Sequence, residues 1–353
     1  MKHWEKTFEI GRTQVGQSQR TYFIAEIGSN HNGSLDEALR YVSEAKEAGA
    51  DAVKFQSFSA AGLLSPKRPK NGSKTDWEEH PAYKIIDGLE LPDDWHRSLK
   101  KECDKLGIHF LSAPFEIGKA RLLKEIGCPA IKIASGEITH DALLREVGSY
   151  GIPVILSTGT ATMGEVEHAS EVLWNAGCRK LFVLHCVSNY PPKFEEMNIP
   201  VIRTMADTLS VPVGLSDHTP GATLPILALG FGSRMVEKHV TFSRQQKGPD
   251  HPYAMEWPEF AAMIREIRNA EAALGDGIKR APEGEAGERI YARKGLYAVK
   301  DLAPGEILTE ANTKLVRHAF GIPANQANLA YGIPLQRPCK KDEAIFWEHL
   351  RKG

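Results

Sequence analysis

Several residue types and patterns are scarce in this sequence. Only five cysteines occur among 353 residues, far apart and without a CxxC pair, so we expect reduced thiols and no disulfide framework. Residues 1–16 contain no signal-peptide-like apolar stretch, and no run approaches the ~18 apolar residues of a membrane span. Neither sign of charge is in excess, since 44 basic and 45 acidic residues give a net charge of −1. We therefore expect a cytoplasmic protein with neither a nucleic-acid nor a membrane partner.

Apolar runs alternate with helical stretches between residues 22 and 275. Each run is rich in Val, Ile, Leu and Phe, ends in polar residues, and is followed by a helical pattern such as 35–50 or 142–151. Eight units of this kind predict an α/β fold, a parallel (β/α)8 TIM barrel of about 250 residues. The alternative is an open doubly wound sheet, which the absence of an early GxGxxG motif disfavours. The predicted strands are residues 22–28, 52–58, 108–115, 130–137, 154–159, 181–191, 213–219 and 235–241.

The chain divides into three parts by composition. The TIM-barrel domain is expected to span residues 1–275. Residues 276–289 are rich in Gly, Glu and Pro and are interpreted as a linker, and residues 290–353 have the short runs and Pro/Gly turns of a small β-rich domain. Within the barrel, residues 59–80 exceed ordinary loop length, which is typical of an active-site lid or a mobile surface loop.

Polar and charged side chains gather at the ends of the predicted strands. TIM-barrel enzymes carry their chemistry at the carboxyl ends of the strands. Any one polar strand end is ordinary, but seven together predict a catalytic site. The candidates are Glu26, Asn30, His31, Lys54, Gln56, Lys132, Ser135, Glu137, Ser157, Thr158, His185, Ser188, Asn189, Tyr190, Ser216, Asp217, His218, Glu237 and His239.

Two lysines, Lys54 and Lys132, lie inside apolar runs. Burying a lysine is costly unless it is paired, and two lysines on neighbouring strands repel each other unless an anion lies between them. With hydroxyls from Ser157 and Ser216 nearby, that anion is expected to be a phosphate or a phosphate-plus-carboxylate ligand. The alternative is two separate Lys–Glu ion pairs. The partners would then be Glu26 and Glu137.

His218 and His239 end two adjacent predicted strands. By strand alternation, Ser216 shares a face with His218, and Glu237 shares a face with His239. Two imidazoles side by side suit a transition metal, and two protein ligands leave room for water and substrate, as a Lewis acid requires. The alternative is two separate hydrogen-bonded histidines.

These residues stand in motifs that occur in order along almost the whole chain. The motifs are FIAEIGSNHNGS (23–34), AVKFQ (52–56), SAPF (112–115), IKIASGE (131–137), LSTG (156–159), LHCVSNYP (184–191), GLSDHT (214–219), EKHVT (237–241) and GPDHPYAME (248–256). Read together, they resemble the sialic acid synthase family, and the tail resembles the antifreeze-like (SAF) domain that follows the barrel in this family.

The resemblance implies a transferase that condenses phosphoenolpyruvate with N-acetylmannosamine or a related amino sugar, giving N-acetylneuraminate or a related nonulosonic acid and phosphate. It implies a divalent metal on His218 and His239, with Mn2+ first and Mg2+ or Co2+ as alternatives. Catalysis or sugar contact would fall to Glu26, Glu137, Tyr190 and Asp250. Substrate binding would fall to Lys54, Gln56, Lys132, Ser135, Ser157, Ser188, Ser216 and Glu237.

By the same resemblance, Arg317 corresponds to the arginine that the family's antifreeze-like domain extends into the partner subunit's site. This implies a domain-swapped homodimer. The sequence departs from the family pattern at His318 and Ala319, where many members have Pro-Gly, and at Ser188, where some have Asn. The stretch TFSRQQKGPDHPY (241–253) also differs from the LDR-type stretch common in the family. These departures concern the sugar more than the reaction.

Three other functions compete with this interpretation. The first is a Schiff-base aldolase or lyase of sialic-acid-type sugars, with Lys54 or Lys132 as nucleophile. The second is a metal hydrolase, which usually needs more ligands than two histidines. The third is a binding protein whose tail domain recognises glycans while the barrel is inert. The many reactive strand ends argue against the third.

Overall fold

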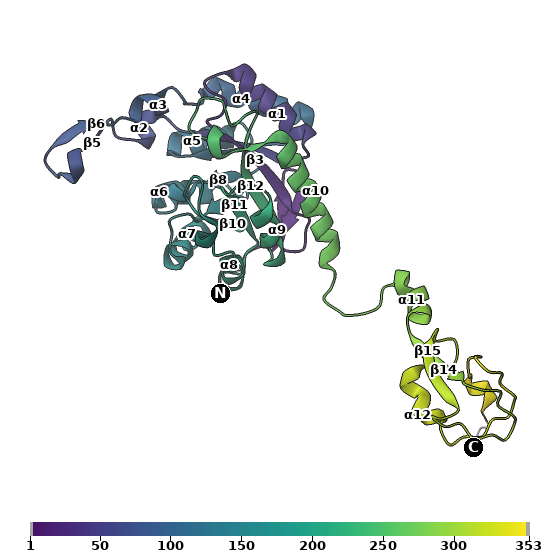
Figure 1. Ribbon diagram of the computed structural model, residues 1–353. Coiled ribbons are helices and arrows are strands. Elements are labelled where there is room, and N and C mark those ends of the chain that lie inside the picture. The colour runs from purple at the N-terminus through teal and green to yellow at the C-terminus, as the bar shows by residue number, and fades with distance from the viewer. Residues whose placement is uncertain (1–2, 351–353) are drawn as a thin grey trace. The chain divides into compact units, whose positions relative to one another are not determined.

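The computed structural model describes residues 3–350, which are drawn in Figure 1. The chain folds into two compact units, Met1–Gly275 and Asp276–Gly353. No helix among the described residues is long and apolar enough to cross a membrane. The expected cytoplasmic location stays a prediction.

Eight parallel strands form the centre of the first unit, in the order β7-β4-β3-β12-β11-β10-β9-β8. The two ends of this order, β7 and β8, pack side by side, which brings the sheet nearly to closure. The predicted TIM barrel is therefore confirmed, and the open sheet is excluded. The strands are β3 (Tyr22–Gly28), β4 (Ala52–Ser57), β7 (His109–Pro114), β8 (Ile131–Ile133), β9 (Val154–Ser157), β10 (Leu181–Cys186), β11 (Val213–Asp217) and β12 (Met235–Thr241).

Some predicted strands were longer than the observed ones. The run at 130–137 yields only the three residues of β8, followed by the 3-10 helix η2 (Ser135–Glu137). The run at 181–191 yields β10, which ends at Cys186. In both cases the missing part is the polar end of the run, which leaves the sheet to form a loop above the barrel interior.

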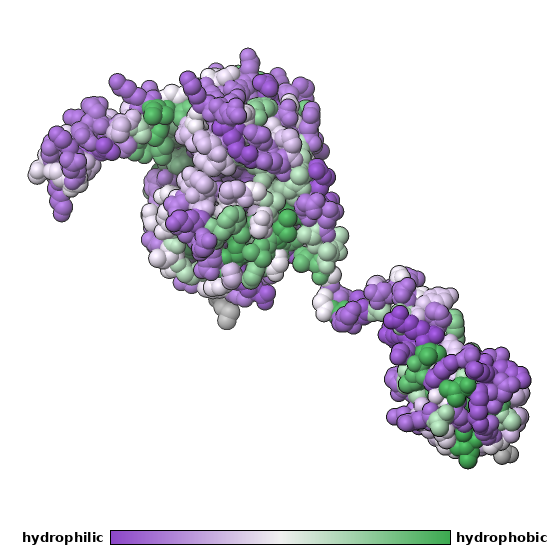
Figure 2. Space-filling model, in the orientation of Figure 1, coloured by the Kyte–Doolittle hydropathy of each residue, from purple (hydrophilic) through white to green (hydrophobic). Residues whose placement is uncertain are grey.

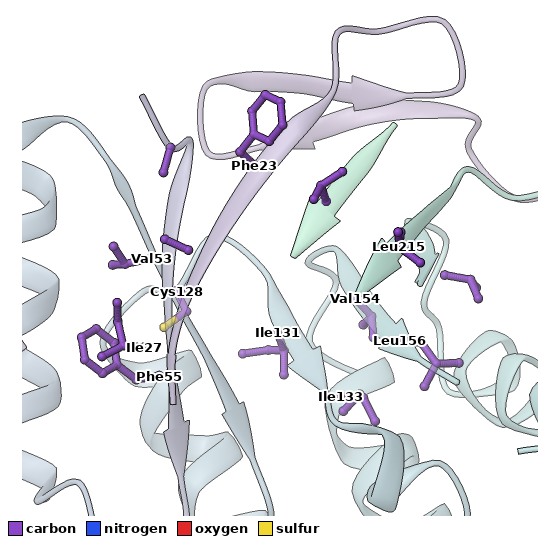
Figure 3. Packing of buried hydrophobic residues seen from close by; sticks show 14 of the residues in the cluster. Phe23, Ile27, Val53, Phe55, Cys128, Ile131, Ile133, Val154, Leu156 and Leu215 are labelled. Carbon is purple, nitrogen blue, oxygen red and sulfur yellow. The ribbon is translucent and has the colours of Figure 1, made fainter. Parts of the chain in front are cut away.

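A helix follows each barrel strand. Helix α1 shows why, because Ser34 accepts a hydrogen bond from Glu37 N at its start and Ala38, Tyr41, Val42 and Ala45 are buried at 3–4 spacing. Such apolar faces cover outward-facing strand residues, among them Phe23, Val53 and Ile131 in Figure 3. The helices are α1 (Leu35–Glu47), α4 (Asp93–Leu106), α5 (Ile117–Glu125), α6 (Asp141–Gly148), α7 (Met163–Asn175), α8 (Val201–Leu209), α9 (Thr223–Gly230) and α10 (Trp257–Leu274).

A short antiparallel hairpin, β1 (Thr7–Ile10) and β2 (Thr13–Gly16), precedes the barrel. The sequence analysis assigned no structure to it. Its side chains Phe8, Ile10 and Val15 are buried in one cluster with the first residues of several barrel strands, such as Tyr22 and Met235. The hairpin therefore fills the amino-terminal end of the barrel interior and leaves the carboxyl end for the site.

The long segment between β4 and α4 forms a surface arm. It contains α2 (Ala60–Leu63), β5 (Lys67–Pro69), η1 (Lys70–Gly72), β6 (Trp77–Glu79) and α3 (Tyr83–Asp87). The β5–β6 hairpin projects from the barrel in Figure 1, and its surface in Figure 2 is largely hydrophilic. Neither strand of this hairpin has a buried residue. A role as a lid stays a prediction.

The second unit is small and irregular, with strands β14 (Lys294–Ala298) and β15 (Thr313–Arg317) and the helix α12 (Ala327–Ala330). Isolated bridges tie its loops together around a core that includes Leu296, Ile322 and Ile345. The expectation of a small β-rich tail is confirmed. The predicted linker at 276–289 is partly helical, because η5 (Glu283–Glu285) and the start of α11 (Ala286–Tyr291) lie within it.

The packing of the β1–β2 hairpin in the barrel leads to a prediction about stability. Phe8→Ala removes a side chain that is 3% exposed, and we expect it to lower the free energy of unfolding by ~3–5 kcal/mol because a cavity remains. Glu9→Ala, an exposed position on the same strand, should change it by less than ~0.5 kcal/mol. Urea unfolding measures both. Equal values for the two variants would contradict the packing role of β1.

Candidate active site

Four buried charges meet inside the barrel: Glu26, Lys54, Lys132 and Glu237, each at most 5% exposed. Lys54 Nζ lies 2.7 Å from Glu26 Oε2 and 3.8 Å from Glu237 Oε1. Lys132 Nζ lies 3.6 Å from the same Glu237 oxygen. The lysines are not on neighbouring strands as expected, because β7 lies between β4 and β8. They come together through Glu237, which β12 supplies from across the barrel.

Of the two separate ion pairs in the alternative interpretation, the structure contains one and lacks the other. Lys54 does pair with Glu26, but Glu137 is not the partner of Lys132. Instead Glu137 lies 3.0 Å from His140 Nδ1, on the loop after β8. The residue Gln56, expected at the site, donates to Glu26 Oε1 at 3.0 Å and so helps to hold that carboxylate.

Protonation differs among these four groups. Burial opposes the charged form of Glu237, but Lys132 and Lys54 outweigh it and lower the pKa of Glu237 to about 2. Burial raises the pKa of Glu26. Burial also lowers the pKa of Lys132, whereas Glu237 and Glu26 raise the pKa of Lys54 against burial. Glu26 is therefore the carboxylate of this cluster that takes up a proton more readily.

Serine hydroxyls line the barrel beside Lys132. Lys132 Nζ donates to Ser157 Oγ at 2.6 Å, and Ser135 Oγ accepts from Gly159 N at 3.0 Å. A Cβ at Gly159 would lie 2.1 Å from Ser188 Oγ and 2.8 Å from Ser135 Oγ. The loops after β8, β9 and β10 thus converge where only glycine fits. Hydroxyls, backbone N–H groups and an ammonium in one place are the donors that a phosphate or carboxylate requires.

The two predicted histidines stand side by side, with ring centroids 5.3 Å apart. His218 Nδ1 donates to Val187 O at 3.1 Å, so Nε2 is the ring nitrogen that remains to bind a metal ion. His239 Nδ1 is buried without a hydrogen-bond partner, and Asp250 Oδ2 is 3.9 Å away. Two nearby imidazoles, one of them with an unpaired buried nitrogen, fit a metal ion better than two separately satisfied histidines.

A metal ion at this place would have few protein ligands. Within residues 3–350, no group of three or more His, Cys, Asp or Glu side chains is arranged to hold one. Two histidines would leave the rest of the coordination shell to water and substrate, as expected from the sequence. Space beside His239 is tight, because a Cβ at Gly28 would lie 2.5 Å from Asp250 Oδ2 and 3.2 Å from His239 Cε1.

Asp250 is held in place by three hydrogen bonds. It accepts from Ser29 N at 3.1 Å, Ser29 Oγ at 2.9 Å and Tyr253 OH at 2.7 Å. Burial opposes its charge, but His239 and these hydrogen bonds outweigh burial and lower the pKa of Asp250. The site therefore contains an ionised carboxylate facing the imidazole of His239.

Two tyrosines border the histidines. Tyr190 lies 4.3 Å from His218 and Tyr253 lies 5.1 Å from His239, both between ring centroids, and the two tyrosine rings are 5.2 Å apart. Tyr190 is 53% exposed and stands at the mouth of the site. The sequence analysis singled out Tyr190 but missed Tyr253, although it lies in the quoted motif GPDHPYAME, three residues after Asp250.

A buried thiol was also missed. Cys186 ends β10, and its thiol contacts His218 and Ser135. Burial opposes its ionisation, but these contacts and the charge of Lys132 outweigh burial and lower the pKa of Cys186. Its position in the motif LHCVSNYP, two residues before Ser188, was the available signal.

Several predicted strand-end candidates instead satisfy local hydrogen bonds. Asn30 donates to Val240 O at 2.8 Å, and His31 Nδ1 accepts from Gly33 N. The others make the following contacts: Thr158 with Leu184 O, His185 with Met197 O, Asn189 with Glu196, and Asp217 with Lys238. Arg317 lies in the other unit, exposed at the end of β15.

A nearly closed TIM barrel with buried lysines, serines and two adjacent histidines at its carboxyl end is typical of an enzyme of the TIM-barrel class. The comparisons with known proteins go further. The profile of the NeuB family matches residues 41–279, and that of the SAF domain matches residues 293–351. The chain belongs to the NeuB family, and it is an enzyme of the sialic acid synthase type.

Named relatives cover nearly the whole chain. An N,N'-diacetyllegionaminic acid synthase of Campylobacter jejuni is 37% identical over 93% of this chain and 99% of its own. A pseudaminic acid synthase of the same species is 35% identical, over 88% of this chain and 91% of its own. The crystal structure of a sialic acid synthetase from Leptospira borgpetersenii, in complex with citrate, is similar with a TM-score of 0.72. It shares 32% identity and covers 81% of this chain and 96% of the other.

The charge cluster predicts a specific pH dependence. The pKa of Glu237 is about 2, below its ordinary value of 4.5, so its contribution to stability is present above pH 4.5 and is lost as pH falls toward 2. Glu237→Gln should therefore destabilise the protein near neutral pH, and the difference from the natural protein should shrink below pH 4.5. Urea unfolding at pH 7 and pH 3 measures this. Glu47→Gln, on the exposed side of α1, is the control, and a difference that grows on acidification would contradict the prediction.

Proposed function

We propose that this enzyme condenses phosphoenolpyruvate with the open-chain aldehyde of an N-acetylated amino sugar. The acceptor would be N-acetylmannosamine or a bacillosamine-derived sugar, and the products would be a nonulosonic acid and phosphate. The observation that carries the proposal is that Lys54 and Lys132 converge next to the two adjacent histidines. Beside Lys132 lie the hydroxyls of Ser135, Ser157 and Ser188, which we call the serine cradle. Names of the relatives support the product class.

Phosphoenolpyruvate suits the cradle because it carries a phosphate and a carboxylate. Lys132 with the hydroxyls of Ser135, Ser157 and Ser188 would bind one anionic group. Lys54 and the hydroxyl of Ser216 would contact the other. Ser216 donates to Glu237 Oε1 at 3.0 Å, so an arriving anion would compete with this carboxylate for the same donors.

The paired histidines would hold a divalent metal, for which we propose Mn2+ with Mg2+ or Co2+ as alternatives. When bound, it supplies Lewis-acid polarisation of the acceptor's carbonyl. Asp250 and Tyr190 would orient the sugar hydroxyls above His218 and His239. The unpaired Nδ1 of His239 and the donor set support this assignment.

Glu26 would act as the general base that accepts a proton from the attacking water. The methylene carbon of phosphoenolpyruvate bonds to the aldehyde carbon, which leaves C2 electron-poor. Water then adds at C2, and the ionised Glu26 would take one of its protons and pass it to the alkoxide formed from the aldehyde oxygen. The new C2 hydroxyl then loses its proton to the departing phosphate as the C2=O bond forms and the C2–O bond to phosphate breaks. Burial raises the pKa of Glu26, which makes its ionised carboxylate a stronger base than an ordinary glutamate. Glu137 is the second choice, since it is paired with His140.

A phosphate-release assay tests the whole proposal. Phosphate should appear from phosphoenolpyruvate only when a sugar from a panel of hexosamines, including N-acetylmannosamine and bacillosamine-derived sugars, is present. Lys132→Ala should weaken phosphoenolpyruvate binding by ~2–5 kcal/mol, because the buried anionic group of the ligand would lose its positively charged partner. Borohydride trapping with pyruvate is the counter-test. A covalent adduct on Lys54 or Lys132 would instead establish the Schiff-base aldolase.

The metal assignment predicts loss of turnover in His218→Ala and His239→Ala, with the fold retained. A chelator should inactivate the natural enzyme, and Mn2+ should restore it. His168→Ala, an exposed histidine on α7, is the matched control and should keep full activity. Full activity after exhaustive chelation would rule out the metal.

We also propose a domain-swapped homodimer in which Arg317 reaches the partner's sugar site. Arg317→Ala and His218→Ala, each inactive alone, should then complement each other after subunit exchange. One site of the mixed dimer would carry both changes and the other neither, so up to about half of the activity per dimer returns. Lys294→Ala, the cross-strand neighbour of Arg317, should stay active by itself. No recovery after demonstrated exchange would falsify the swap.

A further inference from the structure

A buried ion pair stands directly beside the two histidines. Asp217 and Lys238 are register partners on β11 and β12, and each immediately precedes one of the histidines, His218 or His239. Because side chains alternate along a strand, Asp217 and Lys238 point away from the barrel interior into which the histidines point. Both are almost completely buried, at 1% and 2% exposure. Asp217 was predicted among the polar strand ends, whereas Lys238 was not predicted.

This pair also ties down the residue that follows His218. Asp217 Oδ1 accepts from Thr219 N at 3.0 Å and from Thr219 Oγ1 at 2.8 Å. Lys238 Nζ donates both to Asp217 Oδ2 and to the carbonyl oxygen of Thr219. Thr219 is fully buried. His218 is therefore the middle residue of a turn whose two ends are bonded to each other and to β12.

The two histidines differ in how the sheet holds them. His239 lies within β12 and is register partner of Glu26 on β3. His218 lies one residue beyond the end of β11, where the strand ladder has stopped. Its backbone position relative to β12 thus depends on the side-chain bonds of Asp217, Lys238 and Thr219 rather than on strand pairing.

From this geometry we infer that Asp217 and Lys238 are positioning residues that set the separation of His218 and His239. The inference rests on the proposed metal role of the histidines. A buried ion pair contributes little net stability, since desolvation offsets the attraction. The bonds from this pair to both ends of the His218 turn are what support a positioning role. Both side chains point away from the barrel interior, so we expect their effect on a metal ion to pass through the histidines.

The test separates positioning from stability by comparing single and double substitutions. Lys238→Met alone leaves Asp217 unpaired, and Asp217→Asn alone leaves Lys238 unpaired, so both should destabilise the protein. The double variant has no buried charge at these two positions, and its urea unfolding should return close to that of the natural protein. The asparagine side chain carries no charge but keeps an oxygen for Thr219. The double variant therefore keeps the backbone pairing of β11 with β12 and loses the bonds from Lys238 Nζ to Asp217 and to Thr219 O.

Mn2+ affinity, measured by calorimetry on the metal-free full chain, is the deciding readout. We expect the stable double variant to bind Mn2+ about 10–100-fold more weakly, with an altered visible spectrum of the Co2+ form. Tyr22→Phe is the matched control. It removes the Tyr22 OH–His109 Nδ1 contact of 2.7 Å at the other end of the barrel, and it should leave Mn2+ affinity unchanged.

Three outcomes overturn the inference. First, the double variant binds Mn2+ as tightly as the natural protein while His218→Ala loses the metal. This result would contradict the positioning role and would still support the metal site. Second, unchanged affinity in His218→Ala removes the proposed metal site and the inference with it. Third, Tyr22→Phe and the double variant weaken Mn2+ binding to the same extent. This would show that any substitution in the core lowers Mn2+ affinity.

Discussion

The balance of four buried charges is the constraint on which the rest of the site depends. Lys54 and Lys132 are placed inside a barrel where water is scarce, and this is tolerable because Glu26 and Glu237 are within 4 Å of them. The balance also sets the chemistry. In the proposed reaction, a bound anion would add negative charge to the cluster. Burial already raises the pKa of Glu26, and the added charge would raise it further, which would make the ionised carboxylate a stronger base. Under this proposal, one cluster of charges would both bind the anion and take up the proton.

The fold places this cluster by dividing the barrel interior into two halves. The amino-terminal half is filled by Phe8, Ile10 and Val15 of the first hairpin, which exclude water from below. The carboxyl half receives the loops that follow the strands, and these loops are packed closely enough that Gly28 and Gly159 have no room for a side chain. Close packing of loop backbone, more than the strands themselves, gives the serine hydroxyls and Asp250 their positions.

Much of this could be predicted from the sequence, and the failures have physical reasons. Long runs of Val, Ile and Leu show the eight barrel strands, because a strand buried on both faces needs apolar residues throughout. The hairpin at 7–16 was missed because four-residue strands carry too little pattern. The alternative in which Glu137 pairs with Lys132 was also wrong, because the pairing with Glu237 crosses the barrel and follows from strand order, which local sequence does not encode. Tyr253 was passed over because an aromatic residue beside polar ones is ordinary in a loop.

Glu237 connects the two parts of the site, because it and His239 lie two residues apart on the same face of β12. Its carboxylate is 3.6 Å from Lys132, while the imidazole of His239 borders Asp250. Burial lowers the pKa of His239, and Lys54 and Lys132 lower it further against the opposing charges of Asp250 and Glu237. A neutral imidazole is the form that binds metals. The lysines that would attract the anionic substrate thus also favour the protonation state in which His239 can act as a ligand, so one set of charges prepares both halves of the site.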